Sequence, residues 1–274
     1  MPKLFDVRHP VAEELKTLKG LWIDTFHDSP SLVEHFFEYA VTEQDIVVAI
    51  WDGNVASALY MLDSTIANNG KCYKALYIYA VCTHPDYRGR GLMRACFDFL
   101  YEVARERGVD YLFLVPAEEN LFGMYEKIGF KNGIYYSEKK AFSKELTCEA
   151  PPVEKLTFAD FINIRSSFSD KLSLATLGER AFNGFLLPES ESVGAIKVGN
   201  GYAIYEIEDG GVTVHELFGD EKIILKSVFD LTGVESLTVR GFGDERSSIP
   251  FGMYKVVGDA PEINNAFFGI PYGG

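Results

Sequence analysis

Apolar side chains recur along the chain with two different periods, and these periods predict its elements. In the stretch 11–26 they are spaced by three or four residues, as on one face of an amphipathic helix (Leu15, Leu18, Trp22 and Phe26). A second helix is predicted from Pro30 onward, because Asp28 or Ser29 can cap it and proline is favoured in a first turn. The N-terminal part is therefore predicted to hold two consecutive helices.

Runs rich in β-branched and aromatic residues follow, and they predict strands. Residues 45–63 form two such runs around a tight turn at Asp52 and Gly53, and residues 74–83 form a third. A helix is predicted from Leu92 to a stop at Gly108, then a strand over 110–117, a short helix over 121–130 and a strand over 134–142. This order predicts a mixed α/β domain that ends near Phe142.

A similar order returns after residues 147–156, where Pro151 and Pro152 indicate a linker. Helices are predicted over 158–168, 174–187 and 221–231, and strands within 192–218 and over 235–242. Two strings also recur in order: "GVDYLFLV" (108–115) returns as "GVESLTV" from Gly233, and "FGMYEKIG" (122–129) as "FGMYKVVG" (251–258). We interpret this as a tandem duplication with domains at 1–146 and 152–274; shared strand–helix units are the alternative.

Composition fits a globular protein with a sizeable core, since 47% of the 274 residues are hydrophobic and 24% are charged. No apolar run reaches the length of a membrane span, and the N-terminal residues lack the pattern of a signal peptide. The four cysteines show no CxxC pair and no cluster with histidine, so neither a metal site nor a disulfide framework is predicted. We expect a cytoplasmic protein with reduced thiols.

The charge balance is acidic, with 26 basic and 40 acidic residues and a net charge of −14. Such a surface repels nucleic acids and anionic membranes, so neither is expected as a partner. It slightly favours a cationic partner, and solubility alone is the simpler explanation.

The segment "VCTHPDYRGRGLMRACFDFL" (81–100) goes against this charge, because it places glycines between arginines at the start of a predicted helix. The first N–H groups of a helix lack intrahelical partners and carry a partial positive charge. Gly89 and Gly91 permit positive φ and remove Cβ atoms that would hold a phosphate away, while Arg88, Arg90 and Arg94 add positive charge. We interpret the loop as an anion site, with a plain helix cap as the alternative; the Rossmann and P-loop patterns are both incomplete.

The sequence around this loop, "AVCTHPDYRGRGLMRACFDFL…YLFLVPAEENLFGMYEKIGF", resembles the acetyl-CoA core of the GNAT (GCN5-related) acetyltransferase superfamily. That family's pattern is a strand, Q/R-x-x-G-x-G/A leading a helix, a strand, and a helix with a tyrosine before lysine-x-glycine-phenylalanine. Read from Arg88 only Met93 departs from it, and read from Asp86 only Asp86 does. The tandem arrangement is loosely similar to acetyltransferases of the enhanced-intracellular-survival (Eis) type. The resemblance implies an α/β (mixed α+β) GNAT fold, with a mixed, mostly antiparallel sheet flanked by helices and then a second, degenerate GNAT-like domain.

The resemblance also implies that the chain binds acetyl-CoA as a co-substrate. The residues whose main-chain groups would hold its pantetheine arm and pyrophosphate are Val81, Cys82, Thr83, Arg88, Gly89, Arg90, Gly91, Leu92 and Met93. Tyr125 matches the family's general acid, which protonates the departing thiolate, and a packing role is the alternative for it. In the second half Asp220 and Glu221 stand where this loop would be, and carboxylates there repel a diphosphate. The second domain is therefore expected to cover the acceptor side or to mediate assembly.

No general base stands out in the sequence. The candidates are Glu34, Glu38, Glu118, Glu119, Tyr77 and Tyr79, and for each a solvated or packing role is favoured over catalysis. Asn120 is placed too close to Tyr125 to match the asparagine of the family, His84 is expected to be a solvated loop residue, and Cys82 is expected to be a buried thiol. A serine hydrolase is not supported, since no G-x-S-x-G elbow occurs.

The leading hypothesis is an acetyl-CoA-dependent N-acyltransferase that moves an acetyl group to a primary amine by direct attack in a ternary complex. A non-catalytic acyl-CoA-binding sensor or interaction module is the alternative, and the missing base favours it; a scaffold without ligand is the third. The sequence leaves open the acceptor amine, the acyl chain length, the oligomeric state and the role of the second domain.

Overall fold

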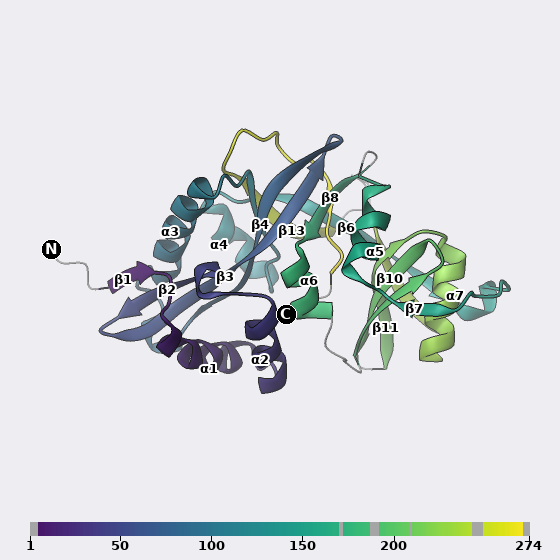
Figure 1. Cartoon of the computed structure of the whole chain (residues 1–274), viewed down its shortest axis with the longest axis horizontal. Coiled ribbons are helices and arrows are strands. Elements are labelled where there is room, and N and C mark those ends of the chain that lie inside the picture. Colours follow the sequence, from purple (N-terminus) through teal and green to yellow (C-terminus); the bar gives the residue numbers. More distant parts are fainter. Residues whose placement is uncertain (1–4, 170–171, 187–191, 209, 243–248, 271–274) are drawn as a thin grey trace.

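The computed structural model describes residues 5–169, 172–186, 192–208, 210–242 and 249–270. Within these ranges fourteen strands form one sheet, mostly antiparallel, with helices packed against it (Figure 1). The predicted mixed α/β fold is confirmed. The predicted division into domains 1–146 and 152–274, parts of which lie outside the described residues, stays a prediction.

The first half supplies the left part of the sheet in Figure 1 and two layers of helices. Its strands are β1 (Phe5–Arg8), β2 (Ile46–Trp51), β3 (Asn54–Asn68), β4 (Lys71–Thr83), β5 (Tyr111–Leu114) and β6 (Lys131–Phe142). Its helices are α1 (Leu15–Phe26), α2 (Pro30–Tyr39), α3 (Leu92–Glu106) and α4 (Phe122–Glu126). Nine of these ten elements lie within or overlap stretches predicted from the sequence, and β1 was not predicted.

Local signals set several of these boundaries as predicted. Ser29, rather than Asp28, caps α2 by accepting the N–H of Leu32 at 3.3 Å. Asp52 and Gly53 both have positive φ, as a two-residue hairpin between β2 and β3 requires. Gly108 follows α3 with a φ of 63°, so the predicted stop is confirmed.

The second half continues the same sheet. Its strands are β7 (Val153–Lys155), β8 (Ser173–Leu177), β9 (Val193–Val198), β10 (Gly201–Glu208), β11 (Gly211–Phe218), β12 (Ser236–Gly241), β13 (Ile249–Val256) and β14 (Ala266–Phe267). Its helices are α5 (Phe158–Ser166), α6 (Glu179–Leu186) and α7 (Glu221–Thr232). The turn between β10 and β11 includes Asp209, which lies outside the described residues.

Two details differ from the sequence-based interpretation. The helix predicted over 174–187 was wrong in its first part, because Ser173–Leu177 is β8 and pairs with the far end of β3; Leu187 lies outside the described residues. The recurring string "FGMY" forms α4 at 122–125 but lies in β13 at 251–254. Only the other repeat keeps its structure, since both of its copies lead into strands, β5 and β12.

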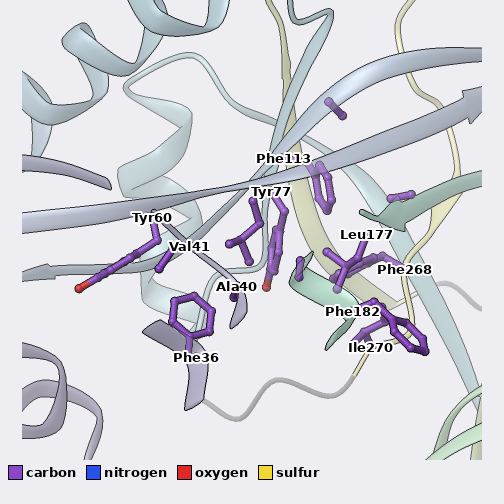
Figure 2. Packing of buried hydrophobic residues seen from close by; sticks show 14 of the residues in the cluster. Phe36, Ala40, Val41, Tyr60, Tyr77, Phe113, Leu177, Phe182, Phe268 and Ile270 are labelled. Carbon is purple, nitrogen blue, oxygen red and sulfur yellow. The ribbon is translucent and has the colours of Figure 1, made fainter. Parts of the chain in front are cut away.

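The two halves share a sheet and a core. In the sheet, β13 of the second half lies between β5 and β6 of the first, pairing antiparallel with both. On one face, beneath α1 and α2, the aromatic rings of Tyr77 and Phe113 contact Phe268, with ring centroids 5.1 and 5.3 Å away (Figure 2). The α3 and α4 face has a separate apolar cluster, and α7 covers a third.

Candidate functional site

The candidate site lies where two neighbouring strands separate. β4 and β5 pair in parallel as far as Tyr77 and Phe113; beyond that β5 ends at Leu114, whereas β4 runs on to Thr83. Beside the opening, Ala80 has a φ of 47°, and the pairing of β3 with β4 shifts register there. From Ile78 to Thr83 no described strand pairs with the side of β4 that faces β5, so this edge can receive an extended chain.

A loop with two glycines connects this edge to α3. Gly89 and Gly91 have φ values of 74° and 78°. An added Cβ would meet no atom within 4 Å at either position, so glycine is required by the backbone conformation and not by a lack of space. The first helical bond runs from the Ala95 N–H to the Gly91 carbonyl at 3.0 Å, and no side chain caps the helix. The N–H groups of Leu92 and Met93 thus have no intrahelical acceptor at the positive end of the helix.

Two arginines shape this loop. The Arg88 Nε donates to the Thr83 carbonyl at 3.1 Å, which ties the loop to the end of β4. Arg90 donates to the Asp86 carbonyl at 3.0 Å, and its guanidinium lies 4.7 Å from the centre of the Trp51 ring. Both side chains are exposed, so they add positive charge in front of α3.

The residues predicted to bind the coenzyme lie along this edge and loop. Their burial distinguishes residues whose side chains can face a ligand from residues that can offer only main-chain groups. Arg88 to Gly91 are exposed, and Val81, Thr83 and Met93 are half-buried. Cys82 and Leu92 are buried in the core on opposite faces of the sheet, so only their main-chain groups can face a ligand. Burial raises the pKa of the Cys82 thiol to about 12, as expected for a packing residue.

Tyr125 lies on α4 and is 6% exposed. Its ring packs edge-on against Phe97 and Phe130, with centroids 6.0 Å away in each case. Among the described residues its hydroxyl has no hydrogen-bond partner. Burial raises its pKa to about 12, so the phenol is protonated at neutral pH.

A cavity of about 350 Å³ connects Tyr125 to the splayed strands. The first half lines it with residues 77–81 of β4, residues 115–117 after β5, and side chains of α1. The second half adds Glu206, Glu208, His215, Arg240 and Phe251. Sequence reasoning missed these residues, because no local motif marks them and only the shared sheet brings them to the cavity.

Most of the base candidates lie elsewhere. Glu34 is exposed and forms an ion pair with Lys19. Glu118 is exposed and accepts the Asn120 amide at 2.9 Å, and neither side chain lines the cavity. Glu38 and Glu119 are also exposed and also lie outside it, whereas Tyr77 and Tyr79 do line the cavity. His84 accepts the Asp86 N–H at 3.3 Å, in keeping with a loop residue.

The second half has no equivalent of the loop before α3. Asp220 caps α7, where its Oδ1 accepts the N–H groups of Lys222 and Ile223 at 3.1 and 3.3 Å. The chain's own carboxylate thus fills the position that an anionic ligand would need. This contrast leaves α3 as the helix suited to a diphosphate.

Two general properties complete the description. In the described ranges no helix is both long and apolar enough to span a membrane. No group of three or more His, Cys, Asp or Glu side chains that could hold a metal ion occurs there either.

Comparison with known proteins places this geometry in a family context. Residues 6–133 match the model of the Acetyltransferase (GNAT) domain, and no curated protein matches the chain. A GCN5-related N-acetyltransferase from Kribbella flavida is 16% identical, with a TM-score of 0.70 over 92% of this chain and 71% of that chain. Eis1 from Mycobacterium abscessus is 12% identical, with a TM-score of 0.66 over 92% of this chain and 73% of that chain. At such identities the likeness shows a shared fold, and it extends into the second half.

Proposed function

Because residues 6–133 belong to the acetyltransferase (GNAT) family, we propose that the chain is an acetyl-CoA-dependent N-acetyltransferase. Acetyl-CoA supplies the acetyl group, which passes directly to an amine as the C–N bond forms and the C–S bond breaks. The observation that carries this proposal is the open edge of β4 followed by an uncapped helix start. The open edge can pair with the extended pantetheine arm of acetyl-CoA, and the uncapped helix start beside it can bind the diphosphate.

Each part of the site has one task in this proposal. The main chain of Val81 and Thr83 holds the pantetheine arm, and the N–H groups at the start of α3 bind the pyrophosphate. Tyr125 donates a hydrogen bond to the departing sulfur. The acceptor amine occupies the cavity that the second half closes, which gives that half a role in acceptor binding.

Calorimetric titration with acetyl-CoA, followed by thiol release in the presence of amines, tests the proposal. We expect one acetyl-CoA per chain, since α3 begins without a side-chain cap whereas Asp220 caps α7. We also expect thiol release that depends on the amine. Binding without transfer to any amine would favour the alternative of an acyl-CoA-binding sensor. No binding at all would make the loop an ordinary helix cap.

A further inference from the structure

The part of the cavity wall that the second half supplies carries a chain of charged side chains. Glu206 Oε2 lies 3.0 Å from His215 Nε2, and His215 Nδ1 lies 3.1 Å from an Arg240 nitrogen. The Arg240 Nε donates to Glu138 at 3.0 Å, and its guanidinium lies 4.5 Å from the centre of the Tyr136 ring. The four polar groups come from four different strands, β10, β11, β12 and β6, so the shared sheet assembles them.

The donors and acceptors in this chain assign the roles of the two ring nitrogens of His215. A guanidinium can only donate, so His215 Nδ1 must be the acceptor of the bond with Arg240. The proton of the neutral ring is then on Nε2, which donates to Glu206. His215 thus donates to Glu206 and orients its carboxylate.

The charges that line the cavity favour a cation. Asp28, Glu206 and Glu208 contribute carboxylates, and Arg240, which is balanced by Glu138, contributes the cationic side chain. Glu206 is largely buried, with 15% of its side chain exposed, and of the described residues only His215 hydrogen bonds to it. A buried carboxylate with one neutral donor gains from a bound cation, because the cation offsets its lost hydration.

A second observation points to a ligand in the same cavity. Tyr77 is 2% exposed and Tyr125 6%, both line the cavity, and neither hydroxyl has a hydrogen-bond partner in the described parts of the chain. Both side chains border the cavity, so their hydroxyls can donate to a polar ligand there. They belong to β4 and α4, whereas Glu206 belongs to β10; five strands lie between β4 and β10 in the sheet. All three residues nevertheless line the same cavity, so one ligand in it can contact the transfer site and the acidic wall.

We propose that Glu206, oriented by His215 and Arg240, binds a second ammonium group of a diamine acceptor, while its other amine is acetylated beside Tyr125. The inference rests on the proposed function and adds the substrate class. Glu206 is the specificity-determining residue in it, and His215 and Arg240 are positioning residues. Asp28 and Glu208 add negative charge around the same ligand.

Steady-state acetylation of paired probes tests this inference. The probes are diaminobutane, diaminohexane and diaminooctane, each matched with the monoamine of equal length. For the best length we expect kcat/KM to favour the diamine by about tenfold, equivalent to ~1.4 kcal/mol and close to the lower end of the range for a hydrogen bond to a charged group. Glu206→Gln should raise KM for the diamine by about the same factor and change kcat little, because the lost contact is remote from the reacting atoms.

Matched variants separate this contact from general charge and from folding. Glu208→Gln removes the same charge from the same strand and should raise the diamine KM less than Glu206→Gln does. Glu206→Asp should restore part of the diamine preference. His215→Leu should lower kcat/KM for the diamine more than for the matched monoamine, whereas a general loss of structure would lower both equally.

The outcomes distinguish the inference from the function beneath it. Equal kcat/KM for diamines and monoamines, or equal losses for both in Glu206→Gln, would overturn the inference and leave the acetyltransferase standing. Acetyl-CoA binding without transfer to any probe would overturn both.

Discussion

At the scale of single residues, burial decides what Tyr125 can do. A phenol with a pKa of about 12 stays protonated, whereas an ordinary thiol has a pKa of about 8.5. Full proton transfer to a thiolate is therefore uphill by roughly 5 kcal/mol. We infer that Tyr125 acts chiefly as a hydrogen-bond donor to the charge that develops on sulfur. Its removal should therefore lower the rate less than the removal of an acid whose pKa matches that of the thiol.

Tyr125→Phe should lower kcat by roughly 10²-fold, at the lower end of general acid effects, and leave acetyl-CoA affinity nearly unchanged. Stopped assays of thiol release and calorimetry measure the two quantities. Tyr101→Phe is the matched control, because Tyr101 lies in the same apolar cluster but donates its hydroxyl to the Ile128 carbonyl and does not line the cavity. Equal turnover in Tyr125→Phe and the parent chain would remove Tyr125 from the mechanism.

Buried tyrosines also make stability depend on alkaline pH. Burial raises the pKa of Tyr125 from the ordinary tyrosine value of 10.0 to about 12, and it raises the pKa values of Tyr60, Tyr77 and Tyr202 as well. The unfolded chain ionises these phenols first, so their contribution is fully present below pH 10.0 and is lost as pH rises toward the folded pKa values. Urea unfolding at increasing pH should show the free energy of unfolding falling above about pH 10. A free energy of unfolding that stays constant above pH 10 would contradict this assignment.

At the scale of elements, the start of α3 shows how a short sequence builds an anion site. Positive φ at Gly89 and Gly91 turns the chain so that α3 begins without a side-chain cap. At α7 the same position holds Asp220, which satisfies the helix from within. A loop of four residues therefore decides which helix end remains available to a ligand.

Gly91→Glu should abolish acetyl-CoA binding, because a carboxylate would occupy the helix start and repel the pyrophosphate. The substitution also places a side chain at positive φ, which costs about 1 kcal/mol of stability. Gly108→Glu is the matched control. Gly108 has a positive φ similar to that of Gly91 and equally open surroundings, but it lies at the opposite end of α3. Thermal unfolding should show similar losses in both, and calorimetry should show lost binding in Gly91→Glu alone. Lost binding in both variants would indicate damage to the fold instead of the site.

At the scale of the whole molecule, the halves are joined by main-chain pairing. β13 hydrogen bonds to β5 from Met253 opposite Leu114 to Val256 opposite Tyr111. Arg180 of α6 also forms an ion pair with Asp45 of the first half at 3.0 Å. Without the second half, β5 would become an edge strand with buried apolar residues exposed on it.

A chain truncated after Leu146 should therefore fail to unfold cooperatively and should not bind acetyl-CoA. Calorimetric melting and acetyl-CoA titration measure both properties. The control is the full chain with a protease site inserted after Glu149 and then cleaved, in which both pieces should stay together and bind. A truncated chain that melts cooperatively and binds acetyl-CoA would show an independent first domain instead.

The sequence by itself determined the elements whose causes are local. Each of these causes acts over a few residues: glycine at positions of positive φ, the cap at Ser29 and the apolar stripe of α3. The helix α3 and the loop before it could therefore be predicted. The candidate coenzyme residues and Tyr125 were identified by a motif of the same local kind. Their positions along β4, the loop and α4 follow directly from chain order.

Only the tertiary structure decided the rest, because strand pairing joins residues far apart in the chain. "FGMY" is helical in α4, where the Phe130 N–H closes the turn on the Tyr125 carbonyl, and extended in β13, where β5 and β6 supply hydrogen bonds on both sides. The same four residue types thus adopt the secondary structure in which neighbouring segments satisfy their main-chain hydrogen bonds. The acidic wall of the cavity has the same origin, since Glu206, His215 and Arg240 meet when β10, β11 and β12 pair with one another, and the pairing of β12 with β6 joins them to the sheet of the first half.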